Sequence, residues 1–317
     1  MSDRPTVTLP PDWAQRMSGL PAEGGPTGAD WVRRLPRLIE DLLTEWRLRP
    51  TGAPMTGWTA VVVPVRRHDG STAMLKVCWP HLESAGEHLA LRRWAGDGAV
   101  RLLAADPGRG ALLLEALDAT RDLGPVWIDE ACEVLGGLLR RLHVPALPQL
   151  PQLPDYLAGE LDEVQADPGS VPRRYLDRAT SLLRELSSDP AGTATLIHTD
   201  LHYTNVLHRL DGDDTTDGAH RADGPWVAID PKPMAGHPGY ELMPALRNRT
   251  DEYGTGSAVR YLVRRRLELI CEVAGIDVEA AKAWTTIAGL LQIHWNVTSG
   301  DEAGASLAVA VLKALGD

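Results

Sequence analysis

The sequence has only three cysteines in 317 residues, Cys78, Cys132 and Cys271, and none stands in a Cys-x-x-Cys pair. An odd number of widely spaced cysteines argues against a disulfide framework and against a cysteine zinc site. The sequence also lacks any uncharged apolar run long enough to cross a bilayer, and it does not begin with the apolar core of a secretory signal. We therefore expect a cytoplasmic protein with no membrane span.

Positive charge is in deficit, since 32 Lys and Arg stand against 43 Asp and Glu, which gives a net charge of −11. This balance argues against nucleic-acid partners and favours cationic small molecules. Two phosphate-binding motifs, Walker A and G-x-G-x-x-G, are also missing. The turn from Thr51 to Thr59, which contains Gly52 and Gly57, is a weak remaining candidate for a backbone that covers phosphates.

The periodicity of the sequence changes from strand-like to helical along the chain. Length and a hydrophobic content of 44% allow a large core and two lobes. The predicted fold class is α+β and bilobal, with a small β-rich N-lobe and a larger, mainly helical C-lobe. Its expected parts are a flexible N-terminal arm over residues 1–29, an N-lobe over 30–114, a connector over 115–120 and a C-lobe over 121–317.

Within these parts, alternating apolar residues predict strands and three- to four-residue spacing predicts helices. The expected strands are a hairpin of Ala60–Val65 and Ala73–Cys78, then Val100–Ala104, Gly110–Leu114 and Trp226–Ile229. The expected helices are Asp30–Trp46, Leu82–Trp94, Trp127–His143, Val171–Leu186, Val259–Val273, Val278–Trp295 and Ala305–Leu315. A Pro-rich connector, Pro145–Pro154, and a hydrophilic surface loop, Asp211–Gly224, complete the prediction.

The stretch Leu196–Leu207, LIHTDLHYTNVL, carries the strongest chemical signal. Its His198, Asp200 and Asn205 have the His-x-Asp-x4-Asn spacing of the protein-kinase catalytic loop. In that loop the Asp accepts the proton of the attacking hydroxyl and the Asn holds a magnesium ion. A capped turn that happens to contain these polar residues is the alternative, so the match needs support from elsewhere in the chain.

Three further residues supply that support in the order that a kinase requires. Lys76 is a charge inside an apolar strand, where it needs a partner or a ligand, and it could clamp ATP phosphates. Glu87 is preferred over Glu83 as its partner because Glu87 is expected at mid-helix. Asp230 ends a short apolar strand and suits a second magnesium ligand. The sequence therefore predicts an ATP- and Mg-dependent phosphotransferase.

Two alternatives from other classes stay open. In an extended segment His198, Asp200 and His202 would face one side, and with His208 and Asp230 they could hold a metal ion in a metal-dependent hydrolase. That model leaves Lys76, Glu87 and Asn205 unexplained, and we expect His198 to anchor the loop instead. The third class is a catalytically inactive nucleotide-binding module.

From about Trp31 to the C-terminal helices, the chain resembles the aminoglycoside phosphotransferase family, which has the protein-kinase-like fold. LIHTDLHYTNVL is similar to that family's His-x-Asp-Leu-His-x-x-Asn loop. Ala111–Leu117 (ALLLEAL) and Ala228–Glu241 (AIDPKPMAGHPGYE) resemble its streptomycin 6-phosphotransferase and hydroxyurea phosphotransferase subgroup, in which Asp-Pro-Lys replaces Asp-Phe-Gly. The polar insertion at Asp211–Gly224 departs from the subgroup.

The resemblance implies roles for single residues of this chain. Asp200 would orient and deprotonate the acceptor hydroxyl, and Asn205 and Asp230 would bind magnesium. Lys76 would contact the phosphates, paired with Glu87. The hinge would run from Glu115 to Leu117 and offer backbone groups to adenine.

The acceptor is expected to be a small cationic antibiotic, with streptomycin favoured and hydroxyurea or another small metabolite as the alternative. Candidate acceptor residues are His202, Glu241 and Trp295. Glu241 could pair with a guanidinium or ammonium group, or it could simply begin a helix before Leu242. A monomer or a simple homodimer is expected.

Overall fold

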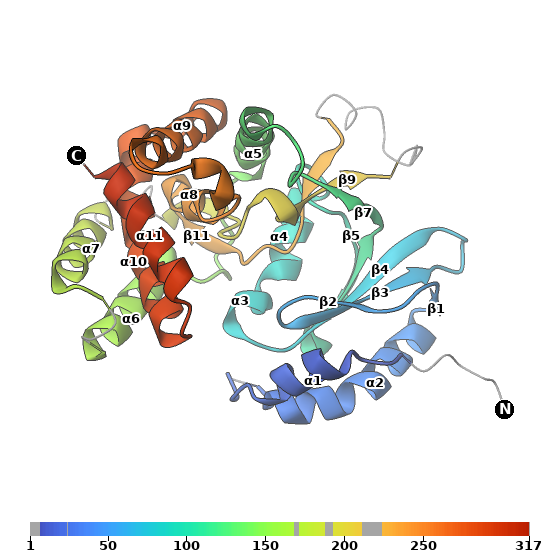
Figure 1. Cartoon of the computed structure of the whole chain (residues 1–317). Coiled ribbons are helices and arrows are strands. Elements are labelled where there is room, and N and C mark those ends of the chain that lie inside the picture. The colour runs from blue at the N-terminus through green and yellow to red at the C-terminus, as the bar shows by residue number, and fades with distance from the viewer. Residues whose placement is uncertain (1–6, 24, 168–170, 188–192, 211–223, 317) are drawn as a thin grey trace. The chain divides into compact units, whose positions relative to one another are not determined.

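The computed structural model describes residues 7–23, 25–167, 171–187, 193–210 and 224–316. Its chain divides into two units. Unit 1 comprises Met1–Gly96, Val100–Asp118 and Arg209–Thr216, and unit 2 comprises Asp97–Ala99, Ala119–His208 and Asp217–Asp317. Unit 1 is built around a sheet, whereas unit 2 is mainly helical, which agrees with the expected α+β class (Figure 1).

The sheet of unit 1 is antiparallel, with the order β1-β3-β4-β6-β5 and with β2 paired to β3. Its strands are β1 (Arg49–Pro50), β2 (Met55–Thr56), β3 (Ala60–Arg66), β4 (Thr72–Cys78), β5 (Leu102–Asp106) and β6 (Ala111–Glu115). The predicted hairpin is confirmed as β3 and β4, and Gly70 in its turn has a φ of +89°, which glycine adopts without strain. Because β4 lies between β3 and β6, Lys76 is on a central strand and not on an edge.

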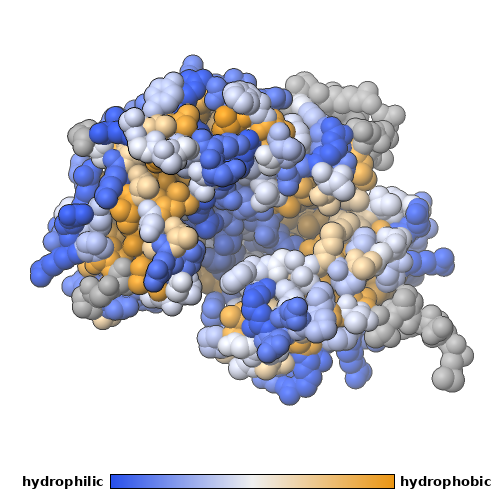
Figure 2. All heavy atoms as spheres, viewed as in Figure 1, coloured by the Kyte–Doolittle hydropathy of each residue, from blue (hydrophilic) through white to orange (hydrophobic). Residues whose placement is uncertain are grey.

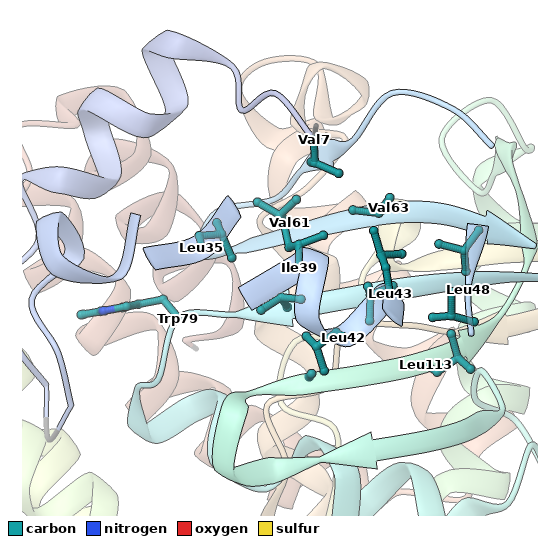
Figure 3. Packing of buried hydrophobic residues seen from close by; sticks show 14 of the residues in the cluster. Val7, Leu35, Ile39, Leu42, Leu43, Leu48, Val61, Val63, Trp79 and Leu113 are labelled. Carbon is teal, nitrogen blue, oxygen red and sulfur yellow. The ribbon is translucent and has the colours of Figure 1, made fainter. Parts of the chain in front are cut away.

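Helix α2 (Gly28–Glu45) packs on one face of this sheet, and the hydrophobic core of unit 1 lies between them (Figure 3). Its buried residues recur at three- to four-residue spacing, as in Leu35, Ile39 and Leu42, and meet the alternate residues Val61 and Val63 of β3. Burying one such side chain contributes about 1.5–3 kcal/mol relative to leaving it exposed. The predicted amphipathic helix is therefore confirmed in its packing.

Two details of α2 differ from the expectation. The helix begins at Gly28 and not at Asp30, with Thr27 as its N-cap, because the Thr27 hydroxyl accepts a hydrogen bond from the Asp30 N–H. The helix then continues through Pro36 to Glu45. A proline in a helix removes one backbone hydrogen bond, and the buried stripe on both sides of Pro36 compensates for that loss.

The expected N-terminal arm contains a helix, α1 (Pro11–Ser18), so the expectation of little regular structure is wrong for this stretch. Trp13 and Met17, one helical turn apart, are both buried. The Trp13 indole Nε1 donates a hydrogen bond to the carbonyl oxygen of Gly57 at 2.8 Å. Proline and glycine content indicated a loose arm, whereas burial of these two apolar side chains in the core of unit 1 stabilises the helix.

The helix expected over Leu82–Trp94 is divided at Gly86 into α3 (Leu82–Ala85) and α4 (Glu87–Trp94). Glu87 is consequently the first residue of α4, and its expected mid-helix position is wrong. Glu87 still reaches the sheet from this position, because its carboxylate contacts Lys76 of β4.

Unit 2 contains seven of the α-helices in the described part of the chain. They are α5 (Ile128–Leu142), α6 (Leu153–Ala166), α7 (Arg173–Leu186), α8 (Leu242–Leu246), α9 (Ser257–Ala274), α10 (Val278–Thr298) and α11 (Glu302–Leu315). Helix α10 packs against α11, α7 and α9. Figure 2 shows apolar residues gathered over α10 and α11 on the visible face. None of the described helices has the length and apolar character that crossing a membrane requires.

Short strands flank the segment around residue 200. Strand β8 (Thr195–Ile197) pairs with β11 (Met234–Gly236), and a second sheet has the order β10-β9-β7. Its members are β7 (Leu117–Asp122), β9 (Val206–Arg209) and β10 (Trp226–Ala228). The two sheets therefore frame both ends of the loop that was predicted to be catalytic.

The Pro-rich connector and the hydrophilic surface loop are the two remaining predicted regions. The Pro-rich connector leads directly into α6, which the periodicity did not reveal because Pro154 stands in its first turn. Residues 211–223 of the predicted surface loop Asp211–Gly224 lie outside the described residues, so that loop stays a prediction.

Candidate active site

Lys76 and Glu87 form a buried ion pair in unit 1. Side chains alternate across a strand, so Lys76 of β4 points away from the α2 face on which Leu75 and Val77 are buried. Its Nζ lies 2.6 Å from Glu87 Oε1, and the two side chains are only 7% and 4% exposed. The expected pairing is thus present. Burying two charges costs several kcal/mol per ion, so such a pair is weak evidence for a stabilising role and suits a functional one.

Glu115, which ends β6, has its carboxylate bound by two arginines of unit 1. Arg209 Nη1 lies 2.8 Å from both carboxylate oxygens, and the Arg101 N–H donates to Oε1 at 2.7 Å. The Glu115 N–H donates in turn to the Arg101 carbonyl oxygen. The side chain of Glu115 therefore fixes local backbone. Arg209 was missed because its contact with Glu115 joins positions 94 residues apart in the sequence, and Arg101 was missed because it belongs to no motif. A contribution of Glu115 and Leu117 to adenine binding stays a prediction.

In unit 2, one side-chain and one backbone hydrogen bond link Asn205 to Asp200 and to the residue before Asp230. The Asn205 side-chain Nδ2 donates to the Asp200 carbonyl oxygen at 2.9 Å. The Ile229 N–H donates to the Asn205 carbonyl oxygen, also at 2.9 Å, which places the next residue, Asp230, beside Asn205. Asp230 is exposed, and the Asp200 side chain is 12% exposed. The geometry that the motif spacing predicted is present.

His198 is completely buried, and both of its ring nitrogens are engaged. Nδ1 accepts a hydrogen bond from the Asp200 N–H at 3.3 Å, so Nε2 carries the proton and donates to the Ile229 carbonyl oxygen at 3.1 Å. Burial lowers the pKa of His198, which favours this neutral form. His198 therefore anchors the loop, as expected.

The metal-dependent hydrolase alternative is wrong in the form that the sequence suggested. Neither ring nitrogen of His198 has a lone pair left for a metal ion. Over the ranges that the structure describes, no three His, Cys, Asp or Glu side chains gather in a way that could hold one.

Glu241 does not face an acceptor, and its expected role in acceptor binding is wrong. The side chain is fully buried. Its Oε1 accepts hydrogen bonds from the backbone N–H groups of His198 and Thr199, the second at 2.8 Å, and its Oε2 lies 2.9 Å from His143 Nε2. Glu241 therefore fixes the backbone of the predicted catalytic loop at His198 and Thr199, a role that only the folded chain reveals.

Two residues of this region have left-handed backbone, which is strained for any residue other than glycine. Thr199 has a φ of +60° and Asp230 has a φ of +58°. Each such conformation costs on the order of 1–3 kcal/mol and persists only where surrounding contacts impose it. For Thr199 those contacts are the Glu241 carboxylate and the Lys232 carbonyl oxygen, which accepts from Thr199 Oγ1 at 2.6 Å. The strain lies directly next to Asp200.

Two cations that sequence reasoning missed contact the Asp200 carboxylate. Lys232 Nζ lies 3.5 Å from Oδ2, and Arg247 Nη2 lies 3.1 Å from Oδ1. Lys232 belongs to the Asp-Pro-Lys motif, so the motif itself was the signal that could have identified it. Arg247 caps the short apolar helix α8 and carries no local signal.

The remaining acceptor candidates lie in different surroundings. His202 is half-buried, and burial lowers the pKa of its imidazole to about 4. Its Nδ1 lies 3.1 Å from Thr204 Oγ1. Trp295, on α10, donates from Nε1 to Glu160 Oε2 of α6 at 3.0 Å, so its described contact is with a neighbouring helix. Roles for His202 and Trp295 in acceptor binding stay predictions.

A model of the family described as aminoglycoside/hydroxyurea antibiotic resistance kinase matches residues 45–300. This chain belongs to that family. A streptomycin 6-kinase from Streptomyces glaucescens is 40% identical over 299 residues, which cover 92% of each chain. A hydroxyurea phosphotransferase from Kitasatospora aureofaciens is 40% identical over 326 residues, covering 96% of this chain and 88% of that one.

The fold of this antibiotic resistance kinase is also that of solved phosphotransferases. The crystal structure of aminoglycoside phosphotransferase APH(4)-Ia matches with a TM-score of 0.54 at 16% identity, over 88% of this chain and 97% of that one. The predicted protein-kinase-like fold and the predicted class, a small-molecule phosphotransferase, are therefore confirmed. Membership of a kinase family also implies ATP as the phosphoryl donor.

Oxygen donors in unit 2 fit a magnesium ion. Because Asn205 Nδ2 donates to the Asp200 carbonyl oxygen, the other atom of the amide, Oδ1, is the one that could bind a metal ion. Asp230 supplies a carboxylate next to it. Magnesium in phosphoryl-transfer enzymes is held by one or two such oxygens together with substrate phosphates, so this donor set is sufficient.

Proposed function

We propose that this chain transfers the γ-phosphoryl group of ATP to a hydroxyl group of an aminoglycoside such as streptomycin, which inactivates the antibiotic. The observation that carries the proposal is that Asn205 is hydrogen-bonded to Asp200 through its side chain and to Ile229, the residue before Asp230, through its backbone. The name of the relative from Streptomyces glaucescens, streptomycin 6-kinase, supports the choice of acceptor. A net charge of −11 is consistent with a cationic acceptor.

Each predicted residue has one role in this proposal. Asp200 accepts the proton of the acceptor hydroxyl and orients that oxygen toward the γ-phosphorus. Asn205 and Asp230 hold magnesium, which neutralises phosphate charge when it is bound. Lys76, oriented by Glu87, contacts the α- and β-phosphates, and the backbone of Glu115 to Leu117 contacts adenine. Residues 30–114 would then bind mainly nucleotide, and residues 121–317 mainly acceptor.

Fixed geometry is the main contribution of the chain to the rate. The strained Thr199 backbone and the Glu241 carboxylate hold the loop on both sides of His198, so Asp200 needs little rearrangement when the acceptor binds. Positioning of this kind accounts for much of the acceleration in phosphoryl transfer.

Hydroxyurea is the second candidate acceptor, because the relative from Kitasatospora aureofaciens is named hydroxyurea phosphotransferase. Hydroxyurea is small and uncharged, whereas streptomycin carries guanidinium groups. The two proposals therefore differ in how strongly the acceptor's KM depends on salt, since only a cationic acceptor gains from an acidic surface.

A panel assay tests the proposed function. Purified protein, ATP and magnesium are incubated with streptomycin, hydroxyurea and two aminoglycosides that lack streptomycin's guanidinium groups, and phosphorylated products are identified by mass spectrometry. We expect the highest kcat/KM with streptomycin and a KM that rises with salt. Faster transfer to hydroxyurea than to streptomycin would identify hydroxyurea as the preferred acceptor. No transfer to any acceptor would refute the proposal.

A further inference from the structure

The ion pair between Lys232 and Asp200 has no place in the roles assigned so far. Lys232 Nζ lies 3.5 Å from Asp200 Oδ2, which is longer than the 2.7–2.9 Å of a charged N–H···O hydrogen bond. The lysine side chain is 37% exposed, and the aspartate side chain is 12% exposed. The ammonium group therefore lies on the open side of the predicted base, in loose contact with it.

The backbone of Lys232 is fixed to the catalytic loop at two points. Its N–H donates to the His198 carbonyl oxygen at 3.0 Å, and its carbonyl oxygen accepts from Thr199 Oγ1 at 2.6 Å. Buried prolines on both sides, Pro231 and Pro233, restrict the backbone further. The Cα of Lys232 is thus held, and the flexible four-carbon stem is the part that can move.

Lys232 is linked to two groups with assigned roles in phosphoryl transfer, to one by sequence and to the other by contact. Asp230, two residues earlier, is the proposed magnesium ligand, and Asp200 is the proposed base. A phosphoryl group in transfer passes between the metal-bound nucleotide and the oxygen held by the base. A cation that contacts the base and follows the proposed magnesium ligand by two residues is therefore a candidate to reach that phosphoryl group.

We propose that Lys232 is a catalytic residue that contacts the phosphoryl group during transfer; this inference rests on the proposed function. The bond between the γ-phosphorus and the β–γ bridging oxygen breaks, and ADP leaves with the electron pair. A bond forms between the acceptor oxygen and phosphorus, and the hydroxyl proton passes to Asp200. Lys232 stays protonated and moves from Asp200 Oδ2 to a phosphoryl oxygen, where it stabilises negative charge.

Arg247 is the matched comparison, because it contacts the other oxygen of the same carboxylate. Arg247 Nη2 donates to Oδ1 at 3.1 Å, and its backbone N–H donates to the Met243 carbonyl oxygen. Arg247 ends helix α8, whereas Lys232 belongs to the segment that carries Asp230. We assign Arg247 the role of a positioning residue, which orients Asp200 without contacting phosphate.

The test compares Lys232→Met, Lys232→Arg, Lys232→Ala and Arg247→Met with the wild type in steady-state kinetics. We expect Lys232→Met to lower kcat by ~10²–10³-fold with little change in either KM, and Lys232→Arg to recover part of that loss. Added methylammonium or ethylammonium should raise kcat of Lys232→Ala and leave Arg247→Met unchanged. Thermal unfolding of each variant checks that it is folded. We expect the Lys232 variants to fold, because the Lys232 side chain is partly exposed.

The outcomes separate this inference from the proposed function. A folded Lys232→Met variant with the wild-type kcat, or a Lys232→Ala variant that amines do not rescue, would overturn the catalytic role of Lys232 while leaving the proposed function intact. A wild-type protein that neither phosphorylates an acceptor nor hydrolyses ATP would overturn the proposed function and this inference together.

Discussion

Glu241 Oε1 accepts a hydrogen bond from the backbone N–H of Thr199 at 2.8 Å, across 42 positions of the sequence. The same oxygen accepts from the His198 N–H. One buried carboxylate therefore holds the strained backbone that precedes Asp200, and this contact fixes the catalytic loop to the rest of unit 2.

Replacement of Glu241 by alanine should destabilise the protein by about 3 kcal/mol, because it leaves two buried N–H groups without an acceptor. We also expect kcat to fall by ~10-fold or more, since Asp200 loses its fixed position. Glu241→Gln is the control, because its amide oxygen can still accept both bonds, and it should lose less of both. Urea unfolding and steady-state kinetics measure the two effects. Equal losses of stability and kcat in the two variants would contradict the proposed role of the Glu241 hydrogen bonds.

Removal of the Lys76 charge should impair use of ATP more than use of the acceptor. We expect Lys76→Met to lower kcat/KM for ATP by ~10–10³-fold, because phosphate contacts are charge-assisted hydrogen bonds. Glu87→Gln, which leaves Lys76 without its ionic partner, should give a smaller loss of the same kind. Glu83→Gln is the control: its side chain is 35% exposed and lies 3.9 Å from His81. A loss with Glu83→Gln as large as with Glu87→Gln would show that the pair has no special role.

Two adjacent glycines of α5 should respond oppositely to alanine. A Cβ at Gly136 would lie 2.7 Å from Val273 Cβ and 2.9 Å from the Ile270 carbonyl oxygen, whereas a Cβ at Gly137 would meet nothing within 4 Å. We expect Gly136→Ala to destabilise by about 1–3 kcal/mol through overpacking against α9. Gly137→Ala should stabilise by up to about 1 kcal/mol through helix propensity. Urea unfolding checks both, and a stabilising Gly136→Ala would disprove close packing of α5 on α9.

Stability should decline at alkaline pH partly because of Cys271. Burial raises the pKa of its thiol to about 12, so the folded protein keeps this thiol protonated where an unfolded chain ionises it. The stabilising contribution is complete below about pH 8.5 and decreases as the pH rises toward the folded value. We expect the free energy of unfolding to fall less steeply between about pH 8.5 and 10.5 in Cys271→Ala than in the wild type. Identical slopes in urea titrations would contradict this attribution.

Short-range patterns predicted the catalytic loop well. Asp200 and Asn205 are only five positions apart, so the short loop between them allows few relative positions of the two side chains. Asp230 was found because it ends a short apolar strand. The pairing of Lys76 with Glu87 was also predicted, although the reason given for choosing Glu87 was wrong: Gly86 begins a new helix, and Glu87 is its first residue.

Long-range contacts were not predictable in the same way. Glu241 was taken for an acceptor residue because an acid before an apolar helix has no local sign of burial, and its partners lie 42 and 43 positions away. Arg247 and Arg209 likewise meet their carboxylates only through the fold. Helix α1 was missed because its stability depends on Trp13 and Met17 packing against the sheet unit, which composition does not reveal.

The most direct test of the account is the rate of phosphoryl transfer to streptomycin by Asp200→Asn, together with its affinity for magnesium ATP by calorimetry. We predict that kcat falls by ~10²–10⁴-fold because the general base is lost, while nucleotide affinity stays within about threefold of the wild type. A folded Asp200→Asn variant that transfers phosphate at the wild-type rate would contradict the central claim that Asp200 is the catalytic base.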